Sequence, residues 1–261
     1  MEEISLPAQE IMKIGSISIS NSFAATVLSS LLIIFVAFLI RRKAGIVPSR
    51  LQVAFEMILE FFLGQLTLAL DNEKRARKIL PLIMTIFLII LLSNQFFLLP
   101  LVGAVVTEGH GGLEEHFFRV PTSDYSLTVA FAALVIILSH VLALAIAPMN
   151  HINNFIRFKS LLKIRKFSDV PNALIEFFLG ILEVIGELAK IISLATRLFG
   201  NIFSGEIIIV IVSGLMFYTQ FLVPIPFYLL GILAGLVQAF VFTILSLLFI
   251  SGTIRHAEHA H

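Results

Sequence analysis

The sequence predicts an all-α integral membrane protein with about five membrane helices, and three observations support this. Hydrophobic residues make up 58% of the 261 residues and charged residues only 13%, with a mean hydropathy of +1.01, whereas soluble domains contain roughly 25% charged residues. The apolar residues are gathered into runs that reach the ~20 residues of a membrane helix. Basic residues are concentrated in only some of the loops between these runs. We therefore expect a single integral membrane domain over residues 1–261.

The first three spans are expected within residues 21–148, after an external N-terminal segment of about 20 residues. Their apolar runs cover residues 23–40, 79–102 and 127–148. Residues 50–70 carry polar side chains on one helical face, which indicates an amphipathic helix at the membrane interface. A soluble-type helix packed on a partner subunit fits this pattern equally well.

The last two apolar runs predict a long, strongly tilted helical hairpin over residues 171–251. A helix over residues 171–218 would be ~72 Å long, whereas the hydrocarbon core is ~30 Å thick. Such a helix either breaks, with Gly200, Gly205 and Gly214 as candidate positions, or lies steeply tilted. The proline-containing turn at residues 223–226 would connect it to an antiparallel partner.

The distribution of basic residues predicts the orientation of the chain. The connection between the first two spans contains Arg41, Arg42, Lys43, Arg50, Lys74, Arg75, Arg77 and Lys78, and the third span is followed by Arg157, Lys159, Lys163, Arg165 and Lys166. By the positive-inside rule these two connections are cytoplasmic. The N-terminus then lies outside and the C-terminus in the cytoplasm.

A stripe of polar side chains follows the first helix of the predicted hairpin. On an ideal helix its members fall within an arc of about 80°, and they are Glu176, Glu183, Glu187, Lys190, Arg197 and Asn201. Glu206 lies about 180° around the helix from Arg197. Charges at membrane depth commonly mark ion paths, although Glu187 and Lys190 are also spaced to form a local structural ion pair.

Arg197 is the most informative member of this stripe. Its guanidinium stays protonated, and a cation at the bilayer centre costs from ~3 to more than ~10 kcal/mol. A fixed cation repels a passing proton and favours the ionised form of an opposing carboxylate. Because the facing helix offers no evident carboxylate, we expect the acid on another subunit. The residues thus predict an ion route interrupted at Arg197.

Four segments of the chain form a distinctive set of motifs. The first is Arg-Leu-Phe-Gly-Asn at residues 197–201, followed by Gly205 and Glu206, and the others are residues 236–242, 121–124 and 93–95. In sequence, order and spacing these segments resemble the a-subunit family of F-type ATP synthases. The resemblance extends from about residue 20 to residue 251.

The resemblance implies a membrane stator subunit of bacterial type that is not an enzyme by itself. It implies two aqueous half-channels that pass protons to and from a rotating c-subunit ring and so couple the ion gradient to ATP synthesis. The implied partners are the c-ring, the b subunit of the peripheral stalk, the remaining ATP synthase subunits and the lipid of the bacterial plasma (inner) membrane. The transported ion is H+ or Na+, and no cofactor, metal or nucleic acid is implied.

Carried over to this sequence, the resemblance makes Arg197 the essential arginine and Gln238 its neighbour on the facing helix. Asn201 and Glu206 would line the external pathway, with Asp124 near its mouth. By position, the other acidic members of the stripe, Glu176, Glu183 and Glu187, would serve the cytoplasmic side of the pathway or be solvated near the interface. Lys190 is included among the candidate pathway residues.

One position departs from the pattern of many relatives, which have a titratable residue seven positions before the glutamine. Here that position is Gly231. His140, within the third span, is either a substitute relay partner for Glu206 or a structural hydrogen-bonding residue. The histidines at positions 256, 259 and 261 have a spacing compatible with metal binding, but we expect a disordered tail there.

A different class of protein remains as the alternative. In a secondary transporter or channel, Arg197 would bind an anionic substrate, but such folds tend to contain two similar halves and the sequence contains no internal repeat. An enzyme fits less well, because neither a nucleophile motif nor a P-loop is present.

Overall fold

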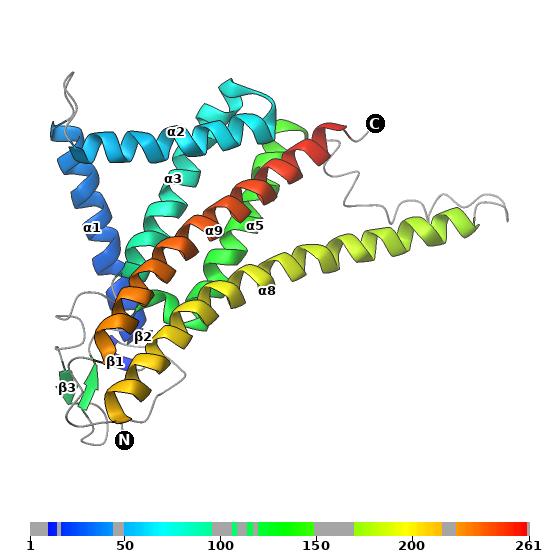
Figure 1. Cartoon of the computed structure of the whole chain (residues 1–261). Coiled ribbons are helices and arrows are strands. Elements are labelled where there is room, and N and C mark those ends of the chain that lie inside the picture. Colours follow the sequence, from blue (N-terminus) through cyan, green and yellow to red (C-terminus); the bar gives the residue numbers. More distant parts are fainter. Residues whose placement is uncertain are drawn as a thin grey trace.

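The computed structural model describes residues 10–14, 17–43, 50–95, 106–108, 114–116, 120–148, 170–215 and 223–259. The long elements of this part are the α-helices α1 (Asn21–Lys43), α2 (Arg50–Leu70), α3 (Glu73–Gln95), α5 (Tyr125–Ile146), α8 (Val170–Leu215) and α9 (Pro224–His259). In Figure 1, α1, α3 and α5 run up and down the bundle, α2 lies across one end, and α8 and α9 run obliquely. The prediction of an all-α membrane protein is confirmed for this bundle.

Two short antiparallel hairpins were not predicted. Strand β1 (Glu10–Ile14) pairs with β2 (Ile17–Ser20), and β3 (Val106–Glu108) pairs with β4 (Glu114–His116). Both lie at the end of the bundle opposite α2 (Figure 1). Residues 17–20 alternate Ile and Ser, and this period of two is the strand signal that a search for long apolar runs passes over.

The length and composition of four described helices are sufficient for a membrane span. The segments are Gln52–Leu70, Glu73–Gln95, Tyr125–Ile146 and Pro224–Ala257, and α1 adds the shorter apolar segment Phe23–Leu39. The first of these belongs to α2, which nevertheless lies crosswise at the end of the bundle (Figure 1). Its orientation therefore supports the predicted interfacial helix, although its composition would also allow a span.

Aromatic packing holds α2 in this crosswise position. The ring centroid of Phe62 lies 5.2 Å from that of Phe87 on α3 and 5.4 Å from that of Phe240 on α9. Phe62 is completely buried. At the C-terminal end of α2, the Arg255 Nη2 donates to the Leu68 carbonyl at 3.3 Å. The negative end of the helix dipole also stabilises a cation at this position.

A two-residue turn produces the sharp change of direction between α2 and α3. Asp71 adopts a φ of 53°, a left-handed conformation that Asp tolerates better than most residues and that ends a helix. Asn72 follows, and its Oδ1 accepts a hydrogen bond from the Arg75 amide at 3.2 Å. This side chain caps the first turn of α3, so two adjacent polar residues set the angle between the helices.

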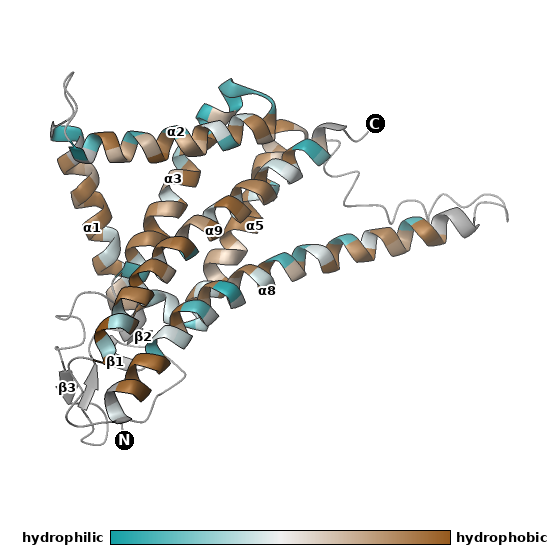
Figure 2. Ribbon diagram, in the orientation of Figure 1, coloured by the Kyte–Doolittle hydropathy of each residue, from teal (hydrophilic) through white to brown (hydrophobic). Residues whose placement is uncertain are grey.

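The core lies where α3, α5, α8 and α9 meet. Helix α9 packs on α3, α5 and α8, and α5 packs on both α8 and α9. Large side chains with less than 2% exposure fill this region: Ile83, Ile90, Leu194, Leu198, Phe242, Leu247 and Ile250. Many apolar side chains remain exposed on α1, α5, α8 and α9, and the ribbons of these helices contain long brown, hydrophobic stretches in Figure 2. Such a surface suits lipid or a partner subunit rather than water.

Helix α8 is one continuous helix of 46 residues. It passes through Gly200, Gly205 and Gly214, so of the two alternatives the break does not occur and the continuous, tilted helix remains. At 1.5 Å per residue it is ~69 Å long, and its N-terminal half projects beyond the rest of the bundle (Figure 1).

Helix α9 is longer than predicted. It continues from the expected end at Ser251 to His259. The expectation of a disordered tail is therefore wrong for His256, which is exposed on the last turns of the helix. Buried Ile254 and Ala257 explain the extension, because they keep this end of α9 packed on the bundle. His261 and the side chain of His259 lie outside the described residues.

Candidate functional site

Arg197 points out of the bundle from the middle of α8. Its side chain is exposed, while Leu194 and Leu198 on either side are 1% and 0% exposed. Within the described part of the chain the guanidinium makes no hydrogen bond or ion pair. The helix therefore buries its apolar face against α5 and α9 and presents the cation outward.

Gln238 lies at the same level as Arg197 on the neighbouring helix. The Asn201 Nδ2 donates to the Ala234 carbonyl at 3.2 Å, which fixes the register between α8 and α9. Arg197 lies one turn before Asn201 on α8, and Gln238 lies one turn after Ala234 on α9. Because the two helices run in opposite directions (Figure 1), these two turns lie side by side. Gln238 is 5% exposed, so it faces the interior while Arg197 faces outward.

A network of amide side chains surrounds this part of α9. The Asn94 Nδ2 donates to the Gly235 carbonyl at 3.1 Å, and the Gln95 Nε2 donates to the Ile232 carbonyl at 3.1 Å. The Thr122 Oγ1 donates to the Asn94 Oδ1 at 2.8 Å. Asn94 and Thr122 were not among the predicted site residues, although a polar triplet that ends an apolar run was a usable signal.

Three further polar atoms are buried at this junction. The Ser93 Oγ, the Gln95 Oε1 and the Gln238 Nε2 have no hydrogen-bond partner among the described residues. Buried polar atoms are ordinarily hydrogen-bonded. These three atoms therefore provide hydrogen-bonding capacity, at or near the level of Arg197, that the described residues do not use.

Asp124 caps α5. Its Oδ1 accepts a hydrogen bond from the Ser126 amide at 2.9 Å, as an N-cap residue does. It follows the short 3-10 helix η2 (Pro121–Ser123), whose three residues are all buried and which packs against α1, α3, α5 and α8. The predicted pathway residue thus has a structural role as well, for which Asp before an apolar run was the sequence signal.

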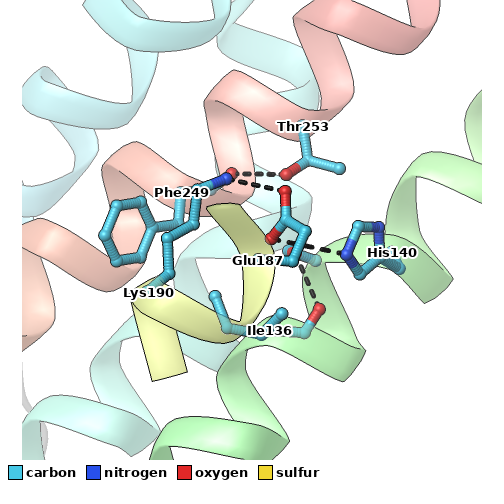
Figure 3. A network of polar contacts seen from close by, with 7 residues as sticks. Ile136, His140, Glu187, Lys190, Phe249 and Thr253 are labelled. Carbon is cyan, nitrogen blue, oxygen red and sulfur yellow. Dashed lines mark hydrogen bonds and ion pairs between the residues drawn. The ribbon is translucent and has the colours of Figure 1, made fainter. Parts of the chain in front are cut away.

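His140, Glu187 and Lys190 form a cluster between α5 and α8 (Figure 3). The Lys190 Nζ lies 2.7 Å from the Glu187 Oε1, and the His140 Nε2 lies 3.6 Å from the Glu187 Oε2. The Lys190 Nζ also lies 5.5 Å from the ring centroid of Phe249 on α9. The local ion pair between Glu187 and Lys190, one of the two predicted alternatives, is present.

The position of His140 does not fit a direct relay to Glu206. His140 is beside Glu187, and Glu206 lies 19 residues further along the same continuous helix, a distance of ~28 Å. The idea that His140 substitutes for the missing side chain at Gly231 is therefore wrong as a direct contact. The sequence could not indicate this, because it gave no register between α5 and α8.

The remaining predicted residues differ in their exposure. Glu176 is exposed on the projecting half of α8, whereas Glu183 and Glu206 are half-buried. The predicted stripe is therefore divided: Glu187, Lys190 and Asn201 contact the bundle, while Glu176 and Arg197 face outward. Among the described residues, no group of three or more His, Asp or Glu is placed to hold a metal ion.

Comparison with known proteins gives the family directly. A family model described as "ATP synthase A chain" matches residues 23–251. The chain belongs to this family. It is 34% identical to the ATP synthase subunit a of Moorella thermoacetica over 94% of this chain and 96% of the relative. It is 30% identical to the ATP synthase subunit a of Citrifermentans bemidjiense over 83% and 80% of the two chains.

Family membership assigns the chain to the membrane sector of an ATP synthase, as a component of that complex. The matched region contains every predicted site residue from Asp124 to Gln238. It also contains all the described contacts around Arg197 and around Glu187. The apolar helices agree with an integral membrane protein that takes part in ion transport and ATP synthesis.

Proposed function

We propose that this chain is the ion-translocating stator subunit of its ATP synthase, which passes protons between two aqueous half-channels and a rotating c-subunit ring. The observation that carries the proposal is the outward-facing Arg197, which has no hydrogen bond or ion pair within the described part of the chain. A permanent cation on an apolar surface requires a partner. A carboxylate on a neighbouring subunit would provide one.

The chemistry of Arg197 suits a separator between the half-channels. A carboxylic acid that arrives protonated is favoured to ionise beside the guanidinium, because the cation stabilises the anion. A free proton is repelled by the same charge and does not pass directly from one half-channel to the other. Ion flow would then require the acid to be carried away, which is what couples transport to rotation of the ring.

The surface around Arg197 supports docking of apolar helices. On α8, Ile208 lies on the same helical face as Arg197 and is 42% exposed, and on α9 Leu233 is 59% and Leu236 is 47% exposed. We propose this face of the hairpin as the c-ring contact. The b subunit of the peripheral stalk and the other subunits of the complex would contact the rest of the chain, which by itself is not catalytic.

The proposed half-channels lie on either side of Arg197. Asn201 and Glu206 would serve the external one, with Asp124 near its mouth and the buried amide network beside it, and Gln238 would lie beside Arg197 between the two half-channels. On the cytoplasmic side, Glu176 and Glu183 lie toward the N-terminal end of α8, and Glu187 and Lys190 lie nearer to Arg197. This assignment follows the predicted orientation in the bacterial plasma membrane, with the N-terminus outside and the C-terminus in the cytoplasm.

The test is the substitution Arg197→Ala in the assembled complex. We expect ion-driven ATP synthesis in energised vesicles to fall at least ~100-fold, because removal of the separator lets the acid cross without a defined discharge step; a loss of this size corresponds to ~2.7 kcal/mol. The amount of assembled complex should change little, since Arg197 makes no hydrogen bond or ion pair with the described residues.

The matched control is Arg77→Ala, which removes an arginine from an exposed ion pair with Glu73 at 2.7 Å. Exposed ion pairs contribute little, so ATP synthesis should remain close to that of the unmodified complex. Ordinary synthesis by the Arg197→Ala complex would overturn the proposed function.

A further inference from the structure

We propose that Glu187, held between His140 and Lys190, is a positioning residue that fixes the rotation of α8 and thereby the direction of Arg197. This inference rests on the proposed role of Arg197. It assigns to Glu187 and His140 a task that differs from lining an ion path: they anchor the helix that carries the essential cation.

The anchor joins separate helices through one carboxylate. Each oxygen of Glu187 faces a different cation or potential cation, Lys190 on its own helix at 2.7 Å and His140 on α5 at 3.6 Å. The side chains of Glu187 and His140 are only 18% and 22% exposed. Lys190 in turn lies over the ring of Phe249 on α9. The cluster therefore connects α8 to both of its neighbours (Figure 3).

The cluster lies near the place where α8 leaves the bundle. Before it, the helix projects away from α5 and α9 (Figure 1), and large apolar side chains there are exposed, such as Phe178 at 59% and Leu182 at 58%. After it, Leu194 and Leu198 are buried. Contacts at this point therefore control how the packed half of α8 is set against the bundle.

Arg197 lies between two such polar contacts. Glu187 is ~15 Å before it along the helix, and Asn201, one turn after it, donates to the Ala234 carbonyl. On an ideal helix Arg197 is about 80° around from Glu187. With Glu187 directed at α5, Arg197 is held at the edge of the buried face and points outward. A rotation of α8 that lost the Glu187 contact would change the direction of Arg197 by the same angle.

Charge makes this contact more specific than apolar packing. Ridges of apolar side chains tolerate small rotations because their contacts are non-directional. A rotation of α8 would carry Lys190 along with Glu187 but would separate the partly buried carboxylate oxygen from His140 on α5, and a buried polar group that loses its partner is unfavourable. The polar contact thus selects one rotation of α8 among several that would bury similar apolar area.

The experiment measures rotation separately from ion transport. The chain contains no cysteine, so Ile192→Cys and Leu194→Cys each introduce a single thiol into this subunit of the assembled complex. Ile192 is 59% exposed and Leu194 is 1% exposed, and Ile192 lies about 140° around the helix from Arg197, away from the proposed c-ring contact. A membrane-permeant maleimide should therefore label position 192 at least ~10-fold faster than position 194, a ratio that corresponds to ~1.4 kcal/mol.

We expect Glu187→Gln to reduce this ratio to less than ~3-fold and to lower ATP-driven proton pumping per ATP hydrolysed. Glu187→Asp keeps the charge and should retain most of the ratio and most of the pumping. His140→Leu removes the same contact from α5, because leucine has no hydrogen-bond donor, and should act like Glu187→Gln, which provides a second reading if one variant assembles poorly. Glu73→Gln, in the exposed pair with Arg77, is the matched control and should change neither measurement.

An unchanged labelling ratio in Glu187→Gln and His140→Leu would overturn the anchor. If pumping were nevertheless lost, Glu187 would belong to the ion path itself. The labelling ratio does not depend on transport, so it would still report the anchor if Arg197→Ala retained full ATP synthesis and the proposed function failed.

Discussion

Lys190 and Arg197 are two cations on one helix, seven residues apart, and the structure treats them in opposite ways. The Lys190 Nζ lies 2.7 Å from a carboxylate oxygen and 5.5 Å from the centre of an aromatic ring. Arg197 is exposed, and its guanidinium contacts no polar group within the described part of the chain. Both belong to the same predicted stripe of polar residues.

The difference shows that membrane depth and residue type are not sufficient to identify a functional charge. A cation that is neutralised inside its own chain needs no partner elsewhere, and removal of its partner would leave an uncompensated charge. A cation that is left without a partner on an apolar surface implies a partner elsewhere. Neutralisation within the chain is thus the property that separates Lys190 from Arg197.

Exchanging the two cation types is the strongest test of whether Lys190 and Arg197 have different roles. Arg197→Lys should lower ion-driven ATP synthesis at least ~10-fold, because an ammonium lacks the planar fork of donors and can lose its proton when desolvated. Lys190→Arg should retain more than about half of the activity, since a guanidinium can still pair with Glu187 and lie over Phe249.

Both variants are measured as ATP synthesis per assembled complex in energised vesicles. Comparable losses in the two would mean that Lys190 and Arg197 have equivalent roles and that pairing within the chain does not distinguish them.

A substitution at Gly235 tests the close packing of α9 against α3, on the buried side of the hairpin near Gln238. A Cβ added at Gly235 would lie 3.2 Å from the Asn94 Cβ, whereas one added at Gly252 on the same helix would have no atom within 4 Å. Gly235→Ala should therefore push α9 from α3 and lower the free energy of unfolding by about 1–3 kcal/mol. Gly252→Ala should raise it slightly, because Ala favours a helix more than Gly does.

Thermal denaturation of the purified complex checks both variants, with proton pumping measured in parallel. Pumping should fall in Gly235→Ala, because Gln238 lies one turn away and would shift with α9. Equal stability of the two variants would contradict the close approach between α3 and α9.

The helical bundle was predictable because apolar runs of sufficient length have few alternatives in a membrane. The long hairpin was also foreseen, since residues 171–218 exceed the bilayer thickness. The extension of α9 to His259 was not, because its last turns contain charged and polar residues, and only tertiary packing of Ile254 and Ala257 holds them in a helix. Strand β2 has a local signal in the Ile-Ser alternation at residues 17–20, but this signal covers only four residues.

The site was predictable by residue type but not by contact. Arg197 stood out because its charge is costly in an apolar run, and Glu187 with Lys190 stood out by spacing. The pairing of His140 with Glu187 depends on the register between α5 and α8, which no local pattern contains. The same holds for Asn94, Thr122 and Gly235, which are far apart in the sequence and meet only after α3, η2 and α9 have packed.

Asp124 should show the smallest effect and extends the comparison to a carboxylate with an evident structural role. Its Oδ1 accepts the Ser126 amide hydrogen bond at 2.9 Å, and Asn caps a helix about as well as Asp, whereas Ala does not. Asp124→Asn should leave the thermal stability of the complex unchanged, and Asp124→Ala should cost about 1 kcal/mol. Proton pumping per assembled complex should fall less than ~2-fold in both, because water at the mouth of a half-channel can deliver protons without a fixed carboxylate, and 2-fold is only ~0.4 kcal/mol. A several-fold loss of pumping in Asp124→Asn at unchanged stability would instead make this carboxylate an obligatory relay. A carboxylate with a hydrogen-bond partner inside its own chain would then still carry transport, contrary to the distinction drawn from Lys190 and Arg197.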